Sequence, residues 1–226
     1  FHLALSYGTP KRDYSQLRIW TGRRYFSAEN AGEYDVSTQY QAFDTPKGKI
    51  SVDDIFKITR DRLQGTPFDQ SKGVGENRSI AIDRTSQAHV IEMKKGATPI
   101  MWTCLGAPEF GVYVPVPGNL THVPKTFSDA PVTYDSEYFT WLLRDIENVA
   151  ALNREKYASM VQEPFAKLEG KFFDTVGKLG AATEAEANTF FAGSEERAVD
   201  VAHKITRELF TQFSIDSVEA TEFMGS

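Results

Sequence analysis

The sequence predicts an α+β fold, in which antiparallel strands are followed by a helical C-terminal region. Two observations indicate this class. Short apolar runs separated by turn residues fill the middle of the chain, and apolar residues at helical spacing fill its last third. Because strands come first and helices afterwards, alternating βαβ units are not expected. We predict a β-rich part over residues 1–134, with one helix near 51–63, and a helical region over residues 135–226 that packs on it.

The first helix is expected after a mixed, aromatic-rich stretch over residues 1–50, where we predict little regular structure. Ser51 is suited to cap the helix N-terminus, and Asp53 and Asp54 complement the positive end of its dipole. Apolar residues then recur at helical spacing as far as Leu63. Gly65 and the proline that follows are expected to end the helix.

The strands are predicted from β-type runs divided by turn residues. The four runs cover residues 79–82, 88–93, 100–105 and 112–116. The connections between them are short and contain Asp, Ser, Gly and Pro, which favour tight turns. This spacing favours antiparallel hairpins arranged as a meander.

Three apolar stripes at helical spacing follow in the C-terminal region. The first runs over residues 139–150, the second follows Pro164 over residues 165–179, and the third follows Ser194 over residues 198–209. Thr183 and Glu186 have the spacing of a capping box. The stripes fit an intrachain helical layer and a homo-oligomer interface equally well.

Composition excludes several classes of protein. The chain has 226 residues, of which 41% are hydrophobic, and a net charge of −6. No basic run is longer than a pair such as Arg23-Arg24, so nucleic acid is not an expected partner. No apolar run is long enough to span a membrane. The single cysteine, Cys104, allows no internal disulfide and agrees with a reducing compartment, so we expect a cytoplasmic protein.

Titratable residues give few indications of a metal site or a nucleophile. The four histidines stand at no metal-ligand spacing, and no metal or other cofactor is expected. Cys104 lies in an apolar run, where a free cysteine is usually a small buried hydrophobe rather than a nucleophile. His89 is likewise interpreted as a strand residue rather than a base.

Three charged residues are candidates for a functional site. Arg18 is flanked by Leu17 and Ile19, so we expect it to be partly buried and paired. Its guanidinium would lie beside a catalytic thiolate or a substrate carboxylate, or else form a structural ion pair or stack on the neighbouring tryptophan, and the local sequence leaves both open. Asp61 and Asp69 are candidate substrate contacts, although one could pair with a nearby arginine and the other could cap a turn.

Several motifs occur in the order that is found in one family of peptidases. They are Arg18-Ile19-Trp20, the segment from Arg60-Asp61 to Asp69, Arg78-Ser79-Ile80, Ser86-Gln87-Ala88-His89-Val90, Trp102 with Leu105-Gly106-Ala107-Pro108, and Tyr113-Val114-Pro115. Together they resemble the cysteine-type dipeptidases of the dipeptidase A family, to which the secernins are related. The resemblance covers most of residues 1–180. It implies the αββα sandwich of an N-terminal-nucleophile hydrolase, of which this chain would supply the C-terminal part.

The resemblance also implies a chemistry. In that family an N-terminal cysteine thiolate attacks the peptide carbonyl of a short peptide, its own α-amine carries the proton, and no metal or organic cofactor takes part. This chain starts with Phe1, so the nucleophile and most oxyanion-hole donors would lie in a missing N-terminal half, and the isolated chain is expected to be inactive. The resemblance implies that Arg18 corresponds to the arginine that neighbours the thiol in the more distantly related amidases of the same superfamily. Arg62-Leu63-Gln64 departs from the family's His-Tyr-Glu.

Two other functions remain open at this stage. Another amidase of the same superfamily, acting on a non-peptide C–N bond, would share these motifs. A non-catalytic interaction module would share them as well, and it would lack a cysteine upstream of the chain.

Overall fold

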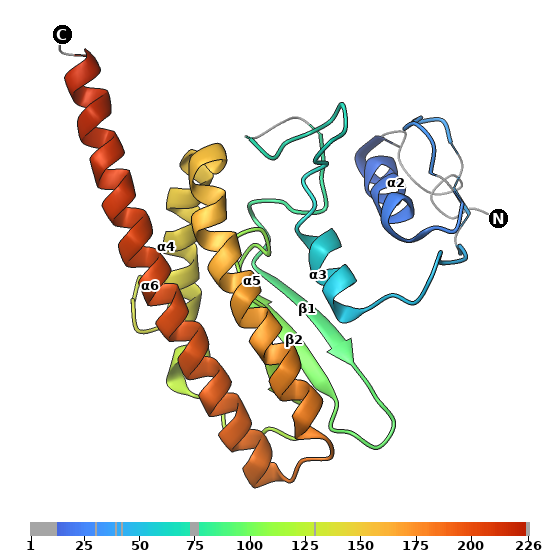
Figure 1. Ribbon diagram of the computed structural model, residues 1–226, viewed down its shortest axis with the longest axis vertical. Coiled ribbons are helices and arrows are strands. Elements are labelled where there is room, and N and C mark those ends of the chain that lie inside the picture. Colours follow the sequence, from blue (N-terminus) through green and yellow to red (C-terminus); the bar gives the residue numbers. More distant parts are fainter. Residues whose placement is uncertain are drawn as a thin grey trace. The chain divides into compact units, whose positions relative to one another are not determined.

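The computed structural model describes residues 13–224 apart from residues 30, 39, 42, 73–76 and 129, and it describes side chains from 15 to 217 within that range. Phe1 and His2 therefore lie outside the described residues. The chain forms two compact units, Phe1–Ile82 and Asp83–Ser226, which are coloured from blue to cyan-green and from green to red in Figure 1. Helices and an antiparallel sheet are both present, and the predicted α+β class is confirmed. The division at residue 134 stays a prediction.

The first unit contains a helix where little regular structure was predicted, and that expectation is wrong. Helix α2 spans Asp13–Phe26. It buries Leu17, Trp20 and Thr21, which lie on one face at helical spacing. The hydroxyl of Thr21 donates to the carbonyl oxygen of Leu17 at 2.8 Å, so that this polar group is buried with a partner. The buried stripe has only two apolar residues, too few for a clear periodic signal.

Helix α3 spans Val52–Thr59, and its predicted N-cap is confirmed. Ser51 and Asp54 form a capping box, in which the amide of Asp54 donates to Ser51 Oγ at 3.2 Å and the amide of Ser51 donates to Asp54 Oδ2 at 2.9 Å. The helix ends four residues before Leu63, earlier than predicted. Leu63 has a φ of 65°, which is left-handed and cannot continue a right-handed helix.

The strand predicted over residues 79–82 does not form. Backbone groups of this segment bond elsewhere in the first unit. The amide of Ala81 donates to the carbonyl oxygen of Asp61 at 3.0 Å, and the carbonyl oxygen of Ser79 accepts from Arg18 Nε at 3.0 Å. Ser79 and Ala81 are buried, but hydrogen bonds to Arg18 and Asp61 take the place of a sheet ladder.

The second unit contains a three-stranded antiparallel meander, as predicted. Its strands are β1 (Gln87–Glu92), β2 (Ile100–Leu105) and β3 (Val114–Pro117), in the order β1-β2-β3. The register pairs His89 with Thr103 and Trp102 with Pro115. Strand β3 begins two residues later than predicted, because the amide of Tyr113 donates to a carboxylate oxygen of Glu169 at 2.7 Å instead of joining the ladder.

Three helices pack on one another and on this sheet, and Figure 1 shows them running side by side. They are α4 (Phe139–Leu152), α5 (Arg154–Leu179) and α6 (Glu184–Met224). Their shared core includes Ile146, Phe172 and Ile205, all fully buried or nearly so. None of the helices in the described range is long and apolar enough to cross a membrane.

The helix starts differ in part from the sequence pattern. The capping box of Thr183 and Glu186 is confirmed, with the amide of Thr183 donating to Glu186 Oε2 at 2.8 Å. Helix α5 starts at Arg154, capped by Asn153, and includes Pro164 in its interior. Ser194 lies inside α6, where its buried hydroxyl donates to the carbonyl oxygen of Phe190 at 2.9 Å.

Candidate functional site

Arg18 lies on α2 with its guanidinium half-buried in the first unit. Its Nε donates to the carbonyl oxygen of Ser79 at 3.0 Å. Burial lowers the pKa of Arg18 from its usual value, although an arginine remains charged. Within the part of the chain that the structure describes, Arg18 forms no salt bridge. The arginine that stacks on Trp20 is Arg24, whose Cζ atom lies 4.9 Å from the ring centroid.

Asp61 follows α3 and is buried, with 3% of its surface exposed. Its Oδ1 accepts from the amide of Leu63 at 2.8 Å, and its Oδ2 accepts from the hydroxyl of Tyr25 at 3.0 Å. Both oxygens therefore have partners within the protein. Burial and the Asp61 carboxylate raise the pKa of Tyr25 to about 12, so that the phenol keeps its proton at neutral pH. Asp61 thus links α2 to the turn after α3.

The turn after α3 is held in a strained conformation by buried contacts. The left-handed backbone of Leu63 costs on the order of 1 kcal/mol for a residue with a Cβ. Its side chain is fully buried in a cluster with Leu17, Trp20 and Tyr40, which offsets that cost. The hydroxyl of Thr66 also donates to the carbonyl oxygen of Leu63 at 2.7 Å.

Asp69 lies at the exposed end of the same loop. Its Oδ2 accepts from the amide of Gly65 at 3.1 Å, and its Oδ1 accepts from the amide of Ser71 at 2.7 Å. The carboxylate therefore organises the loop at both sides of Phe68, whose ring packs edge-on against Tyr34 with centroids 5.2 Å apart. Substrate roles for Asp61 and Asp69 stay predictions.

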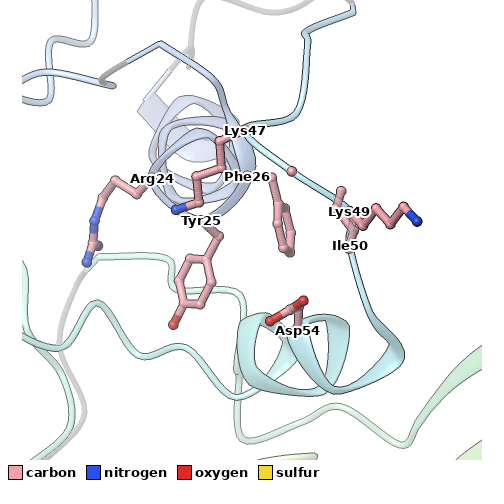
Figure 2. Close-up of a pocket in the computed structure, with 8 residues that line it drawn as sticks. Arg24, Tyr25, Phe26, Lys47, Lys49, Ile50 and Asp54 are labelled. Atoms are coloured by element: carbon pink, nitrogen blue, oxygen red, sulfur yellow. The ribbon is translucent and has the colours of Figure 1, made fainter.

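A pocket of about 500 Å³ lies in the first unit between the end of α2, the segment over residues 47–50 and the start of α3 (Figure 2). We call it the basic pocket, because three of its eight lining residues are cationic. The lining consists of Arg24, Tyr25, Phe26, Lys47, Gly48, Lys49, Ile50 and Asp54. The sequence did not predict this pocket. The signal in the sequence was two short basic segments, Arg23-Arg24 and Lys47-Gly48-Lys49, which lie apart along the chain.

Short-range contacts hold the wall of the basic pocket. The amide of Lys47 donates to the carbonyl oxygen of Phe26 at 2.7 Å, and the amide of Ala28 donates to the carbonyl oxygen of Thr45 at 2.8 Å. Arg23 forms a salt bridge with Asp44 at 2.8 Å. These contacts fix the segment that follows α2 against the end of that helix, so the pocket does not depend on a ligand for its shape.

The charges in the basic pocket are unbalanced. Asp54 is its one carboxylate, and hydrogen bonds from Ser51 lower the pKa of Asp54, so that it stays ionised. Arg24 Nη1 is buried and has no hydrogen-bond partner within the described residues. A buried guanidinium nitrogen without an acceptor is costly.

The structure brings only part of the predicted site together. Asp61 contacts Tyr25, which lines the basic pocket, whereas Arg18 and Asp69 are not lining residues. Cys104 is fully buried in β2 of the second unit, which confirms that it packs as an apolar residue. His89 lies exposed on β1. No group of three metal-ligating side chains occurs among the residues that were placed.

Comparison with known proteins identifies the family. The model of peptidase family C69 matches residues 1–167. A probable dipeptidase B of Streptococcus pyogenes serotype M3 (strain ATCC BAA-595 / MGAS315) is 23% identical over an alignment of 226 residues. That match covers 91% of this chain and 44% of that protein. A dipeptidase of Bifidobacterium longum (strain NCC 2705) is 24% identical over an alignment of 216 residues. That match covers 86% of this chain and 40% of that protein.

The chain thus spans less than half the length of the curated relatives it matches. The match to the family model covers well over half of the chain, and the resemblance drawn from the motifs is confirmed at the level of the family. The chain belongs to peptidase family C69.

Proposed function

We propose that the complete protein is a cysteine-type dipeptidase that hydrolyses the peptide bond of short peptides. The observation that supports this most directly is the family match, together with relatives that are named dipeptidases. The nucleophile is an N-terminal cysteine that lies outside this chain, in the missing N-terminal half of the enzyme. No metal or organic cofactor takes part. A cytoplasmic location, which agrees with the single cysteine of this chain, is part of the same proposal.

The chemistry proceeds in two steps. The α-amine takes the thiol proton, and the thiolate sulfur attacks the carbonyl carbon of the peptide bond. The tetrahedral intermediate collapses to a thioester, and the leaving amine receives a proton from the α-ammonium group. Water then attacks the thioester, which releases the acid and restores the thiol. Hydrogen-bond donors and nearby cations stabilise the negative charge that develops on the oxygen.

Arg18 is our candidate for a cation beside the thiolate or the substrate. Its Nε is held by the Ser79 carbonyl oxygen, and the two terminal nitrogens form no hydrogen bond with any residue that the structure describes. A guanidinium that is fixed at one edge and open at the other can bind a carboxylate or an oxyanion through parallel hydrogen bonds. Half-burial strengthens its field relative to that of an exposed arginine.

The test uses the complete protein and measures kcat and KM for an alanyl-alanine substrate. We expect Arg18→Ala to lower kcat/KM by about 100-fold or more, because a charged contact to the transition state is lost. Arg18→Lys should recover part of that loss. Lys57→Ala, which removes an exposed charge paired with Asp53 on α3, is the matched control and should leave kcat/KM unchanged.

Two results would contradict this assignment. Near-normal turnover by a folded Arg18→Ala protein, judged by an unchanged thermal unfolding midpoint, would remove Arg18 from the reaction. Hydrolysis of acyl amides in place of dipeptides would instead identify an amidase that acts on non-peptide C–N bonds.

A further inference from the structure

We propose that the basic pocket binds the free carboxylate of a short peptide, a substrate class that rests on the proposed function. The pocket would then be the place where the enzyme recognises the C-terminal end of a dipeptide. Arg24 and Lys47 are the groups that contact the carboxylate, and Phe26 and Ile50 form the apolar wall beside it. Neither the matched family nor the names of the relatives assign a role to these residues.

The charge of the pocket favours an anionic ligand. Arg24, Lys47 and Lys49 face a single carboxylate, that of Asp54. This carboxylate already accepts two hydrogen bonds from Ser51, at 2.9 Å from its amide and 2.7 Å from its hydroxyl. In Figure 2 Lys49 extends away from Arg24 and Lys47. We therefore assign Arg24 and Lys47, rather than Lys49, to the ligand.

Arg24 is the more specific of the two cations. Its guanidinium stacks over the ring of Trp20, which fixes its plane. Arg24 lines the pocket, and its Nη1 is buried without a hydrogen-bond partner among the described residues, so any contact with the ligand falls to the other nitrogens of the guanidinium. A planar guanidinium offers parallel donors that match the two oxygens of a carboxylate. Lys47 is exposed and adds charge without directional constraint.

The remaining walls favour a peptide carboxylate over a phosphate. A volume of about 500 Å³ lies in the range of small-molecule sites and leaves room for more than an anion. Phe26 and Ile50 provide apolar surface for the rest of the ligand, and Asp54 would repel a group with two negative charges. A singly charged carboxylate attached to an apolar body satisfies all three features.

Asp61 acts in this scheme as a positioning residue. Its Oδ2 accepts the proton of the Tyr25 hydroxyl at 3.0 Å, and this bond fixes Tyr25 as one wall of the pocket. The amide of Lys47, bound to the Phe26 carbonyl oxygen at 2.7 Å, holds the segment over residues 47–50 against the end of α2. A pocket that is already shaped loses less entropy when its ligand binds.

The experiment measures kinetics and binding with the complete protein. The substrates are alanyl-alanine and alanyl-alanine amide, which differ only in the terminal carboxylate, and the binding probes are N-acetyl-alanine and N-acetyl-alanine amide in a calorimeter. For the wild type we expect KM for the amide to be at least about tenfold higher than KM for the acid. Arg24→Gln and Lys47→Gln should each raise KM and Kd for the acids by about tenfold and leave those for the amides unchanged.

Two variants guard against trivial effects, namely Lys47→Gln and the added control Lys57→Gln. Lys47→Gln changes an exposed side chain and is expected to fold even if Arg24→Gln, which loses its stack on Trp20, does not. Lys57→Gln removes an exposed cation of α3 that does not line the pocket, and it should keep the wild-type preference for the acids.

The outcomes separate this inference from the proposed function. If dipeptides are hydrolysed but Lys47→Gln and Arg24→Gln keep the full preference for the acid, the inference is overturned and the dipeptidase proposal stands. If no dipeptide is hydrolysed but the variants lose binding of N-acetyl-alanine, the inference stands alone. Displacement of N-acetyl-alanine by a lower concentration of inorganic phosphate would identify a phosphate site and overturn the inference.

Discussion

Cys104 and Gly111 are packed so closely in the second unit that neither residue can be enlarged. A Cβ added to Gly111 would overlap Cys104 Sγ and lie 3.1 Å from the carbonyl oxygen of Ala107. The thiol is fully buried. The only cysteine of the chain is therefore a packing residue, in agreement with its apolar sequence context.

This packing gives a prediction at the scale of single residues. Gly111→Ala should lower the free energy of unfolding by about 1–3 kcal/mol, because the new methyl group overlaps the sulfur. Adding Cys104→Ala to that variant removes the sulfur and should restore part of the loss. Urea unfolding of the two single variants and the double variant measures the coupling. Strictly additive effects would contradict the contact.

Residue roles that depend on local sequence were predictable, whereas roles that depend on distant partners were not. Burial of Cys104 and capping by Ser51 follow from their neighbours in the chain. The contact between Tyr25 and Asp61 joins residues 36 positions apart, and no local pattern indicates it. For the same reason Arg18 was recognised as a partly buried cation, but the stack on Trp20 belongs to Arg24.

At the scale of elements, α4 buries a carboxylate against the loop before the sheet. Glu147 is 6% exposed and accepts from Arg144 Nη1 at 2.9 Å. Close by, Arg154 binds Glu109 at 3.1 Å and Asp83 at 2.6 Å. Burial, with the charges of Asp83 and Glu109, raises the pKa of Glu147 to about 7 although both arginines act to lower it. Two arginines therefore do not fully compensate three carboxylates.

The raised pKa sets the sign of a pH effect on stability. The pKa of Glu147 is about 7 in the folded protein and 4.5 as its ordinary value, so between these pH values the folded state holds a proton that the unfolded state has lost. The free energy of unfolding should accordingly fall by about 1–3 kcal/mol as the pH rises from about 4.5 to about 7, and level off above that. Urea unfolding of the protein between pH 4.5 and 8 measures this.

Glu147→Gln is the variant that tests the assignment, because it keeps the size of the side chain and removes its titration. The fall in the free energy of unfolding between pH 4.5 and 7 should be smaller in this variant by about 1–3 kcal/mol, the contribution of Glu147. Glu163→Gln, at an exposed position of α5, is the matched control and should retain the wild-type profile. An identical profile in the wild type and in Glu147→Gln would contradict the assignment.

Elements with a strong periodic signal were predicted, and those shaped by tertiary contacts were not. Strand β2 and the start of α6 follow the pattern closely, since their apolar residues and caps are local features. Helix α2 escaped prediction because, among its described side chains, the buried face contains only two apolar residues, Leu17 and Trp20, beside the polar Gln16 and Thr21. The strand expected over residues 79–82 is absent because its backbone bonds to Asp61 and Arg18.

At the scale of the whole molecule, the chain spans less than half the length of the relatives it matches, and the proposed nucleophile lies outside it. The described residues offer cationic side chains on the first unit and a buried cysteine on the second. The family and the α+β class were predictable, because the ordered motifs and the order of the elements are properties of the sequence. The basic pocket was not, since its walls come from three separate segments.

The central claim is that the complete protein cleaves dipeptides with a cysteine that is not Cys104. The most direct measurement is the mass of the complete protein, and of any chain bound to it, after reaction with a dipeptide-derived chloromethyl ketone, alongside its rate of alanyl-alanine hydrolysis. We predict one added label on an N-terminal cysteine, loss of hydrolysis in proportion to labelling, and the same behaviour in Cys104→Ala. Dipeptide hydrolysis that persists after every accessible cysteine is labelled, or a protein that hydrolyses no dipeptide, would contradict the claim.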